Sequence, residues 1–182
     1  MRLFKNVDIK DLDSILAKGI LSLNESGNNN WKRGKRSRNS CDKVYLFAPT
    51  TKENSFVRYG AALLEVDAEA VENEIDTNDF NYGLYREFIC DRVAPEQITA
   101  IYIPKIFKNR IATISDETLN RITWCDIEAN TWGLDDKVVA NQNDFDCLVE
   151  RGNFEGDDHF NFFRGFTTEQ TVVDYYDIVY KF

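Results

Sequence analysis

Five short, largely apolar runs constrain the fold of this chain more than any other feature of its sequence. Each holds five to eight residues and is rich in β-branched or aromatic side chains, and polar connections follow the second and third of them. Runs of this length and composition predict β-strands. They are LFKNV (3–7), KVYLFA (43–48), AALLEVDA (61–68), REFICDRV (86–93) and QITAIYIP (97–104). We therefore expect a β-sheet.

The REFICDRV run also predicts the direction of its side chains, because successive side chains of a strand point to opposite faces. One face then carries Phe88 and Cys90, and the other carries Glu87, Ile89 and Asp91. Alternation alone makes Glu87 an outward-facing surface glutamate. In this interpretation it pairs with a neighbouring arginine, either Arg86 or Arg92.

Helices are expected between some of these strands, which makes the fold class α+β. In DIKDLDSILAKGILSL, Asp8 can cap a helix, apolar residues recur at helical spacing, and Gly19 can end it. Ser115 can cap a second helix, with an apolar stripe formed by Leu119, Ile122 and Ile127. Pro95 marks a turn. The closing run TVVDYYDIVYKF is β-like.

Composition narrows the class of protein. The 182 residues, 43% of them hydrophobic, are enough to bury the core of one domain, and no linker marks a boundary. No stretch is apolar and long enough to span a bilayer, and the N-terminus lacks the apolar run of a signal peptide, so we expect a cytoplasmic protein without membrane contact. The four cysteines and the single histidine, His159, lack metal-ligand spacing, so no metal is predicted.

Charge is distributed unevenly along the chain. Residues 1–60 carry 12 basic and 6 acidic side chains, whereas residues 61–182 carry 10 basic and 25 acidic ones. The acidic part offers little to a phosphate backbone but could bind a protein partner. The basic charge concentrates in NNNWKRGKRSRNSCDK, where guanidinium groups could grip a phosphate or pyrophosphate. The same segment could equally be a solvated polar loop.

Three stretches, in this order, resemble the DarT-like DNA ADP-ribosyltransferases. LFKNVDIKDLDSILAKGILSLN resembles the strand, helix and glycine turn that begin many ADP-ribosyltransferase folds. VYLFAPTT is similar to the family's YF-x-P-R-S strand, and YREFICDRVAPEQITAIYI is similar to the segment that carries the catalytic glutamate. The resemblance implies an ADP-ribosyltransferase-like split β-sheet core over about residues 1–107. Residues 108–182 would form a C-terminal elaboration packed on that core within a single domain.

The resemblance also implies a reaction, in which NAD is the substrate and Glu87 the catalytic residue. Cleavage of the nicotinamide glycosidic bond develops positive charge on the ribose, and a carboxylate beside it can stabilise that charge or deprotonate the acceptor. The family's catalytic arginine corresponds here to Arg38 or Arg36, with Arg33 as a further contact to the cofactor. Other candidate NAD contacts are Lys5, Asn24, Tyr45 and Phe47.

The chain departs from the family at three places. Lys5 stands where the family has a histidine, Thr50 and Thr51 replace the arginine and serine of its P-R-S, and the insertion before the glutamate is short. Lys5 could instead be an edge-strand charge, and Tyr45 or Phe47 could pack in the core. The acceptor, a nucleic-acid base or a protein side chain, stays open. Alternatives are a catalytically inactive module that binds a nucleotide or protein, and an RNA 2′-phosphotransferase, although the basic second domain of those enzymes is missing.

Overall fold

The structure, a computed structural model, describes residues 1–7, 9–27, 41–49, 62–74, 85–108, 114–127 and 175–180. Within these residues a mixed seven-stranded sheet is combined with short helices, so the α+β class is confirmed. The strands are β1 (Arg2–Val7), β2 (Val44–Pro49), β3 (Ala62–Asp67), β4 (Val71–Glu72), β5 (Tyr85–Cys90), β6 (Ile98–Pro104) and β7 (Ile122–Cys125). The helices are α1 (Leu12–Lys18), α2 (Leu23–Ser26), α3 (Asp116–Arg121), three 3-10 turns (Ile9–Asp11, Pro95–Gln97, Lys105–Phe107) and a C-terminal π-helix (Tyr175–Tyr180).

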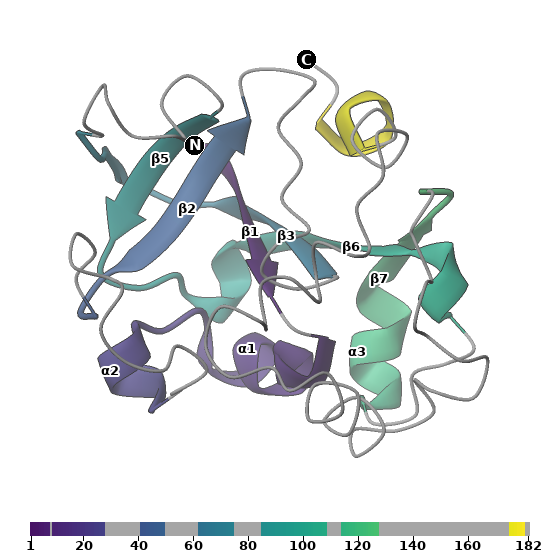
Figure 1. Ribbon diagram of the computed structural model, residues 1–182. Coiled ribbons are helices and arrows are strands. Elements are labelled where there is room, and N and C mark those ends of the chain that lie inside the picture. The colour runs from purple at the N-terminus through teal and green to yellow at the C-terminus, as the bar shows by residue number, and fades with distance from the viewer. Residues whose placement is uncertain are drawn as a thin grey trace, which may run out of the picture.

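The sheet consists of two parts that meet at one residue pair. Its strand order is β4-β5-β2-β1-β3-β6-β7, and all neighbours are antiparallel except β6 and β7. We call β4, β5 and β2 the small wing, and β1, β3, β6 and β7 the large wing. β1 pairs with β3 along its whole length, but with β2 only through Phe4 and Phe47. Figure 1 shows β2 and β5 side by side, turned away from β3 and β6.

All five runs predicted as strands are strands. The two remaining strands were not predicted. β4 has only two residues, Val71 and Glu72, at the start of the polar connection between the third and fourth predicted strands, and it pairs with β5. β7 lies in the stretch that the sequence predicts to be helical.

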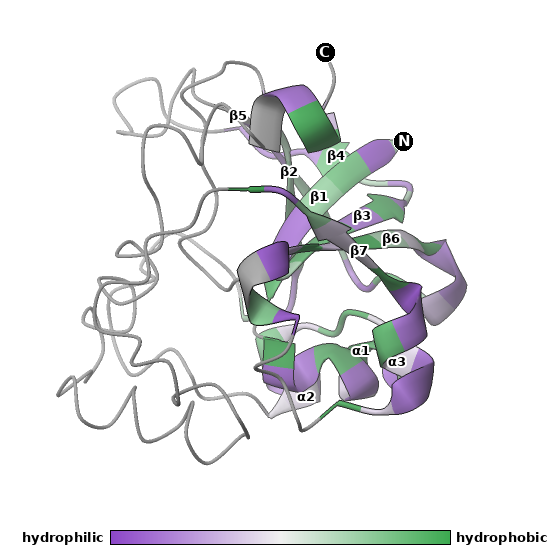
Figure 2. Cartoon of the chain, turned by 90° about the vertical axis from the view of Figure 1, so that its right-hand side faces the viewer, coloured by the Kyte–Doolittle hydropathy of each residue, from purple (hydrophilic) through white to green (hydrophobic). Residues whose placement is uncertain are grey.

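The central strands are buried on both faces, which explains their nearly continuous apolar sequence. In β3, Ala62, Leu63 and Leu64 are each 0% exposed, although Leu63 and Leu64 point to opposite sides of the sheet. The helices cover part of this core with one face each. Figure 2 shows hydrophilic residues alongside hydrophobic ones in α1 and α3, as expected for helices with one buried side.

Gly19 ends α1, as predicted, and its conformation admits only glycine. Its φ of 85° lies in the region that disfavours side chains, and a Cβ there would lie 2.1 Å from the carbonyl oxygen of Val93. This close approach allows Ile20 and Val93 to exchange two backbone hydrogen bonds, of 2.8 and 3.0 Å. The start of the helix differs from the prediction, because a 3-10 turn precedes α1 and Asp11 occupies its N-cap. Asp8 lies outside the described residues.

Two predictions for the C-terminal part are wrong in part. Ser115 does cap α3, accepting the backbone N–H of Thr118 through Oγ, but the helix ends at Arg121. Ile122 then begins β7, because the edge of β6 offers backbone hydrogen bonds that an exposed helical turn does not replace. Within the β-like run TVVDYYDIVYKF, the described residues Tyr175–Tyr180 form a π-helix where the sequence predicts a strand. Tertiary contacts of Val179 and Tyr180 override the local β-propensity.

Two features are absent from the residues that the structure describes. No helix there is long and apolar enough to cross a membrane. Nor do those residues contain a group of three or more histidine, cysteine, aspartate or glutamate side chains that could hold a metal ion. His159 lies outside the part of the chain that the structure describes.

Candidate functional site

Glu87 lies in a row of side chains that crosses the junction between the two wings. It is directly opposite Phe47 of β2, Phe47 is opposite Phe4 of β1, and Phe4 is opposite Glu65 of β3. Residues directly opposite one another in neighbouring strands share a face of the sheet. Two glutamates therefore stand on the same face, one on each wing, with the aromatic pair between them. We call this face the Glu87 face.

The carboxylate of Glu87 is held by an uncharged donor. Asn73, which follows β4, donates from Nδ2 to Oε2 of Glu87 at 2.7 Å, and its backbone N–H bonds the carbonyl of Glu87 at 2.8 Å. The short strand β4 thus positions Asn73 against the middle of β5. The Glu87 side chain is partly buried. An amide donor of this kind helps to fix the direction of a carboxylate.

The two arginines that the sequence offers as partners for Glu87 bind elsewhere. Arg86 points to the opposite face and forms a two-pronged ion pair with Glu72, in which its Nε lies 2.8 Å from Oε1. Arg92 donates from Nη2 to the carbonyl of Lys18 at 3.2 Å. The structure therefore gives each of these arginines a different partner from the one that alternation suggests.

Aromatic side chains close the junction on the Glu87 face. The rings of Phe4 and Phe47 lie 6.0 Å apart, and Tyr180 packs edge-on against Phe4 at 4.9 Å and against Phe47 at 6.4 Å. Phe47, a candidate NAD contact, is only 7% exposed and belongs to the core. Tyr45 is partly buried and lies on the same face as Phe47, two residues along β2.

Lys5 and Glu87 lie on opposite faces of the sheet. Lys5 follows Phe4, so its side chain points away from the Glu87 face. Its Nζ donates to the carbonyl oxygen of Tyr45 at 3.0 Å, in the region where β1 and β2 no longer pair. Lys5 thus links the two wings across the gap with a side-chain hydrogen bond. Burial raises the pKa of the Cys90 thiol, and the positive charge of Lys5 opposes this effect.

Asn24 is exposed on α2, and it contacts Cys41 and Asp42, which lie shortly before β2. Its Nδ2 donates to Oδ1 of Asp42, and its backbone N–H bonds the carbonyl of Cys41 at 3.1 Å. Asn24 therefore ties α2, which precedes the basic segment, to Cys41 and Asp42 near the end of that segment. Residues 28–40 lie outside the described part of the chain. Arg33, Arg36 and Arg38 are among those residues, so the structure does not measure their distance from Glu87.

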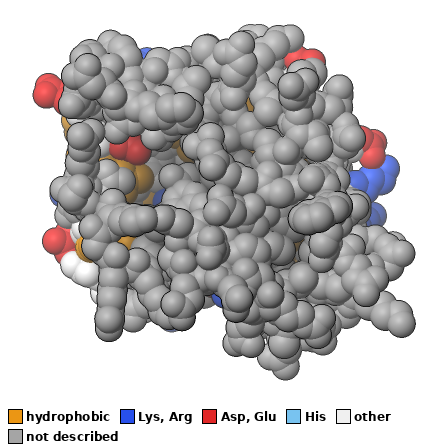
Figure 3. All heavy atoms as spheres, viewed as in Figure 1, with side chains coloured by type: hydrophobic (Ala, Val, Ile, Leu, Met, Phe, Trp, Pro, Cys, Tyr) orange, Lys and Arg blue, Asp and Glu red, His pale blue; other side chains and the backbone are white. Residues whose placement is uncertain are grey.

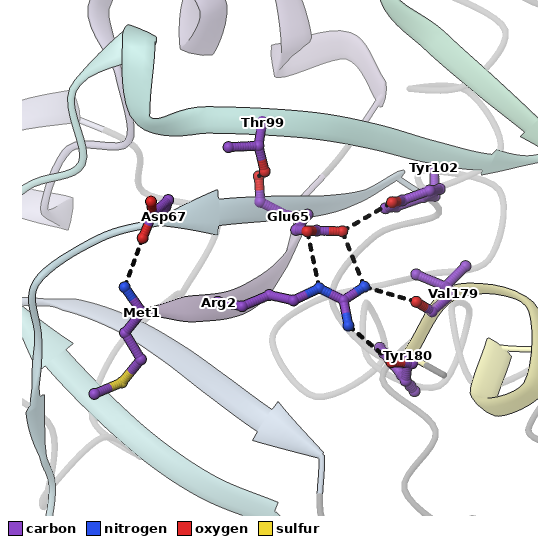
Figure 4. Close-up of polar contacts among 8 residues, drawn as sticks. All are labelled: Met1, Arg2, Glu65, Asp67, Thr99, Tyr102, Val179 and Tyr180. Atoms are coloured by element: carbon purple, nitrogen blue, oxygen red, sulfur yellow. Dashed lines mark hydrogen bonds and ion pairs between the residues drawn. The ribbon is translucent and has the colours of Figure 1, made fainter. Parts of the chain in front are cut away.

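Glu65, the other glutamate of the row, is enclosed by charged and polar partners (Figure 4). Arg2 donates to both of its oxygens, from Nε at 2.8 Å and from Nη2 at 3.1 Å, and the hydroxyl of Tyr102 donates at 2.8 Å. The hydrogen bond from Arg2 lowers the pKa of Glu65, against the opposing effect of burial. Burial, followed by the hydrogen bond to Glu65, raises the pKa of Tyr102 to about 12.

Arg2 also holds the C-terminal helix. It donates to the backbone carbonyls of Val179 and Tyr180, both at 2.8 Å. Figure 4 shows the guanidinium between Glu65 on one side and these carbonyls on the other. A cation suits this position because the last carbonyls of a helix lack partners within the helix and carry partial negative charge.

Asn6 is a residue of interest that the sequence did not single out. It lies on β1, two residues from Phe4, and is 7% exposed. Its Oδ1 is buried without a hydrogen-bond partner. The available signal was a lone amide in the otherwise apolar strand LFKNV, beside the charge of Lys5.

The described surface side chains on the side of the molecule seen in Figure 1 differ between its two edges. Figure 3 shows acidic and hydrophobic side chains at the left, where β2 and β5 lie, and basic side chains with an acidic one at the right.

No family model, curated protein or solved structure matches this chain. The function must therefore be inferred from its own residues and geometry.

Proposed function

We propose that this protein is an NAD-dependent ADP-ribosyltransferase in which Glu87 is the catalytic carboxylate. The observation that carries the proposal is the environment of Glu87. It stands in the middle of β5, next to the junction of the two wings, and the amide of Asn73 donates to its Oε2 at 2.7 Å and so helps to orient the carboxylate. A carboxylate oriented in this way is suited to stabilise positive charge that develops on a bound ribose.

The shape of the sheet supports the same proposal. An ADP-ribosyltransferase-like core is expected to be split, and β1 and β2 pair only at Phe4 and Phe47. The side-chain hydrogen bond from Lys5 to Tyr45 connects the two strands where their backbones have separated. Glu87 belongs to the small wing, one strand away from this separation.

The proposed reaction assigns distinct roles to Glu87 and to the basic segment. Glu87 stabilises the oxocarbenium character of the nicotinamide ribose and helps to deprotonate the acceptor, which is a nucleic-acid base or a protein side chain. The basic segment, with Arg36 and Arg38 as its leading candidates and Arg33 beside them, supplies guanidinium groups for the pyrophosphate of NAD. Asn24 contributes by tying α2 to Cys41 and Asp42 near the end of that segment.

The second candidate is a catalytically inactive module that binds a nucleotide or a protein partner. One observation favours it. Lys5 occupies the position of the family's histidine but faces away from Glu87, so no β1 side chain at that position reaches the carboxylate. In this alternative the acidic half of the chain contacts the partner, and Glu87 has no chemical role.

Labelled NAD distinguishes the two candidates. The intact protein is incubated with NAD and with DNA, RNA or a cell lysate as the acceptor, and both transfer of label and release of nicotinamide are measured. Glu87→Gln should lower the rate about 10²- to 10⁴-fold, the usual contribution of a general acid or base. Glu72→Gln is the matched control, because Glu72 belongs to the same wing but lies opposite Phe88, on the other face.

Equal rates for Glu87→Gln and Glu72→Gln would remove Glu87 from the mechanism. If no acceptor and no condition gave turnover while NAD still bound, the binding module would be the better description. Thermal unfolding of both variants serves as the check that a loss of rate is not a loss of folded protein.

A further inference from the structure

Asn6 stands where β2 has already separated from β1. On its other side it is paired with Leu63 of β3, but Phe4 and Phe47 form the one paired position between β1 and β2. Because Asn6 is two residues from Phe4, its side chain lies on the Glu87 face.

The amide of Asn6 is an exception to the way this protein treats buried polar groups. Within the described part of the chain, Oδ1 of Asn6 is the single buried side-chain oxygen or nitrogen without a hydrogen-bond partner. Buried polar atoms of native proteins nearly always have such a partner, and an unmade hydrogen bond leaves the full desolvation cost of the group uncompensated. Leu3 and Phe4 of the same strand are fully buried. An apolar side chain with the volume of Asn6 would fit among them and avoid this cost. The amide therefore reduces stability and needs another explanation.

We infer that Asn6 is a nucleoside-binding residue, whose Oδ1 accepts a hydrogen bond from the nicotinamide riboside end of NAD. This inference rests on the proposed function. An unpartnered acceptor needs a donor, and the pyrophosphate of NAD offers only acceptors, so the phosphates do not satisfy it. The ribose hydroxyls and the carboxamide N–H₂ of the nicotinamide are donors. The adenosine end of NAD has donors too, in its ribose hydroxyls and amino group. The nicotinamide end is preferred because Glu87 is proposed to act there and Asn6 shares the face of Glu87.

Asn6 is thus a substrate-positioning residue. It replaces, on the correct face of the sheet, the contact that Lys5 was expected to make from the neighbouring position. The amide also differs from the imidazole or ammonium group in chemistry, because it recognises a hydrogen-bond donor without adding charge to the site.

The test combines affinity with stability and uses the full-length chain. The affinities of NAD and of ADP, which lacks the nicotinamide riboside, are measured by titration calorimetry for the wild-type protein, Asn6→Leu and Asn6→Val. NAD should bind these variants about tenfold more weakly, as expected for the loss of one hydrogen bond, whereas the affinity for ADP should not change. Asn120→Leu is the matched control, because Asn120 is exposed on α3, and it should change neither affinity.

The melting temperature supplies a second readout that a merely structural role would move in the opposite direction. Replacing an unpartnered buried amide by an apolar side chain should leave the melting temperature unchanged or raise it. Unchanged NAD affinity in a folded Asn6 variant would overturn the inference, as would failure of both variants to fold, which would assign Asn6 a structural role. NAD affinity is measured without turnover, so a failed inference about Asn6 can be told apart from a failed proposed function. Failure of the proposed function appears as equal labelling by Glu87→Gln and its control. Absence of NAD binding to the wild-type protein would contradict both.

Discussion

The two wings of the sheet each place a glutamate beside the Phe4–Phe47 pair, but they treat it differently. On the large wing, Glu65 is gripped on both oxygens by Arg2 and receives a further hydrogen bond from Tyr102. On the small wing, Glu87 receives the amide of Asn73. A bidentate arginine pairs a carboxylate with a full positive charge and fixes it as part of the structure, whereas the amide of Asn73 contributes to the orientation of one oxygen of Glu87. The two glutamates of this face therefore differ in the described donors that hold them.

The wings also differ in how much of the chain they need. The small wing takes its described strands from residues 44–49, 71–72 and 85–90. The large wing begins at Arg2, is closed by β7, and is covered on the Glu87 face by the C-terminal helix. Its stability thus depends on contacts between the two ends of the sequence, and the predictions below test that dependence.

The largest expected effect comes from deleting residues 108–182. The deletion removes β7 from the sheet and takes Ile114, Cys125, Val179 and Tyr180 out of the hydrophobic core. Domain stabilities are only about 5–15 kcal/mol, and the loss of one large buried aromatic side chain costs about 3–5 kcal/mol. We expect the truncated chain to show no cooperative unfolding transition in circular dichroism. A sharp transition close to that of the intact protein would show that the large wing is independent of the C-terminal part.

A smaller effect is expected for Arg2→Met, which leaves Glu65 without its cation and the carbonyls of Val179 and Tyr180 without their donor. Because Arg2 is partly exposed and screened by solvent, we expect a loss of about 1–2 kcal/mol in the free energy of unfolding near neutral pH. Urea denaturation measures it. The exposed pair of Lys105 and Asp126 gives the control, since Lys105→Met should change little.

The pH dependence of this loss follows from the lowered pKa of Glu65. A carboxyl group with a lower pKa in the folded state stabilises the protein above its unfolded pKa of about 4.3, and this contribution disappears as the pH falls through the folded value. The difference between the wild-type protein and Arg2→Met should therefore shrink in acid. If the stability difference between the two proteins at about pH 3 equals the difference near neutral pH, the effect of Arg2 comes from the carbonyls of the C-terminal helix and not from Glu65.

The last expected effect is absent near neutral pH and concerns Tyr102, whose pKa is raised to about 12. A group with a raised pKa in the folded state stabilises the protein fully below its unfolded value, which is about 10 for tyrosine, and loses this contribution as the pH rises through the folded value. The wild-type protein should thus lose stability between about pH 10 and pH 12 more steeply than Tyr102→Phe, which has no phenol to ionise. Denaturation at several alkaline pH values measures the two slopes. Parallel slopes would contradict the raised pKa of Tyr102, and with it the combined effect of burial and of the hydrogen bond to Glu65.

Local sequence patterns predicted much of the small wing and of the central strands. The alternation in REFICDRV correctly separates Phe88 and Cys90 from Glu87 and Ile89, because the period of two holds in any paired strand. Gly19 was predicted as the end of α1 for a similarly local reason, a backbone conformation that only glycine adopts. β4 was missed because a two-residue strand has no period to detect.

The candidate site was only partly accessible to the same reasoning. Sequence spacing does not show that Lys5 bridges to the carbonyl of Tyr45, since that bond depends on how β1 and β2 separate. Nor does it show that Asn6 is left without a partner, because an absent hydrogen bond is a property of the packed neighbourhood. The partners of Arg86 and Arg92 were likewise assigned by the fold, through β4 and α1.

The sequence by itself determined the five long strands, the end of α1, the capping of α3 by Ser115, and the direction in which Glu87 points along β5. These features depend on backbone geometry and on neighbours a few residues away. Only the tertiary structure decided that Ile122–Cys125 adds a strand to the sheet, that the C-terminal run forms a helix against Phe4, and that Glu65 and Glu87 face the same side of one junction. These outcomes depend on which unsatisfied backbone edges, buried surfaces and charges meet in space, and residues far apart in the chain supply them.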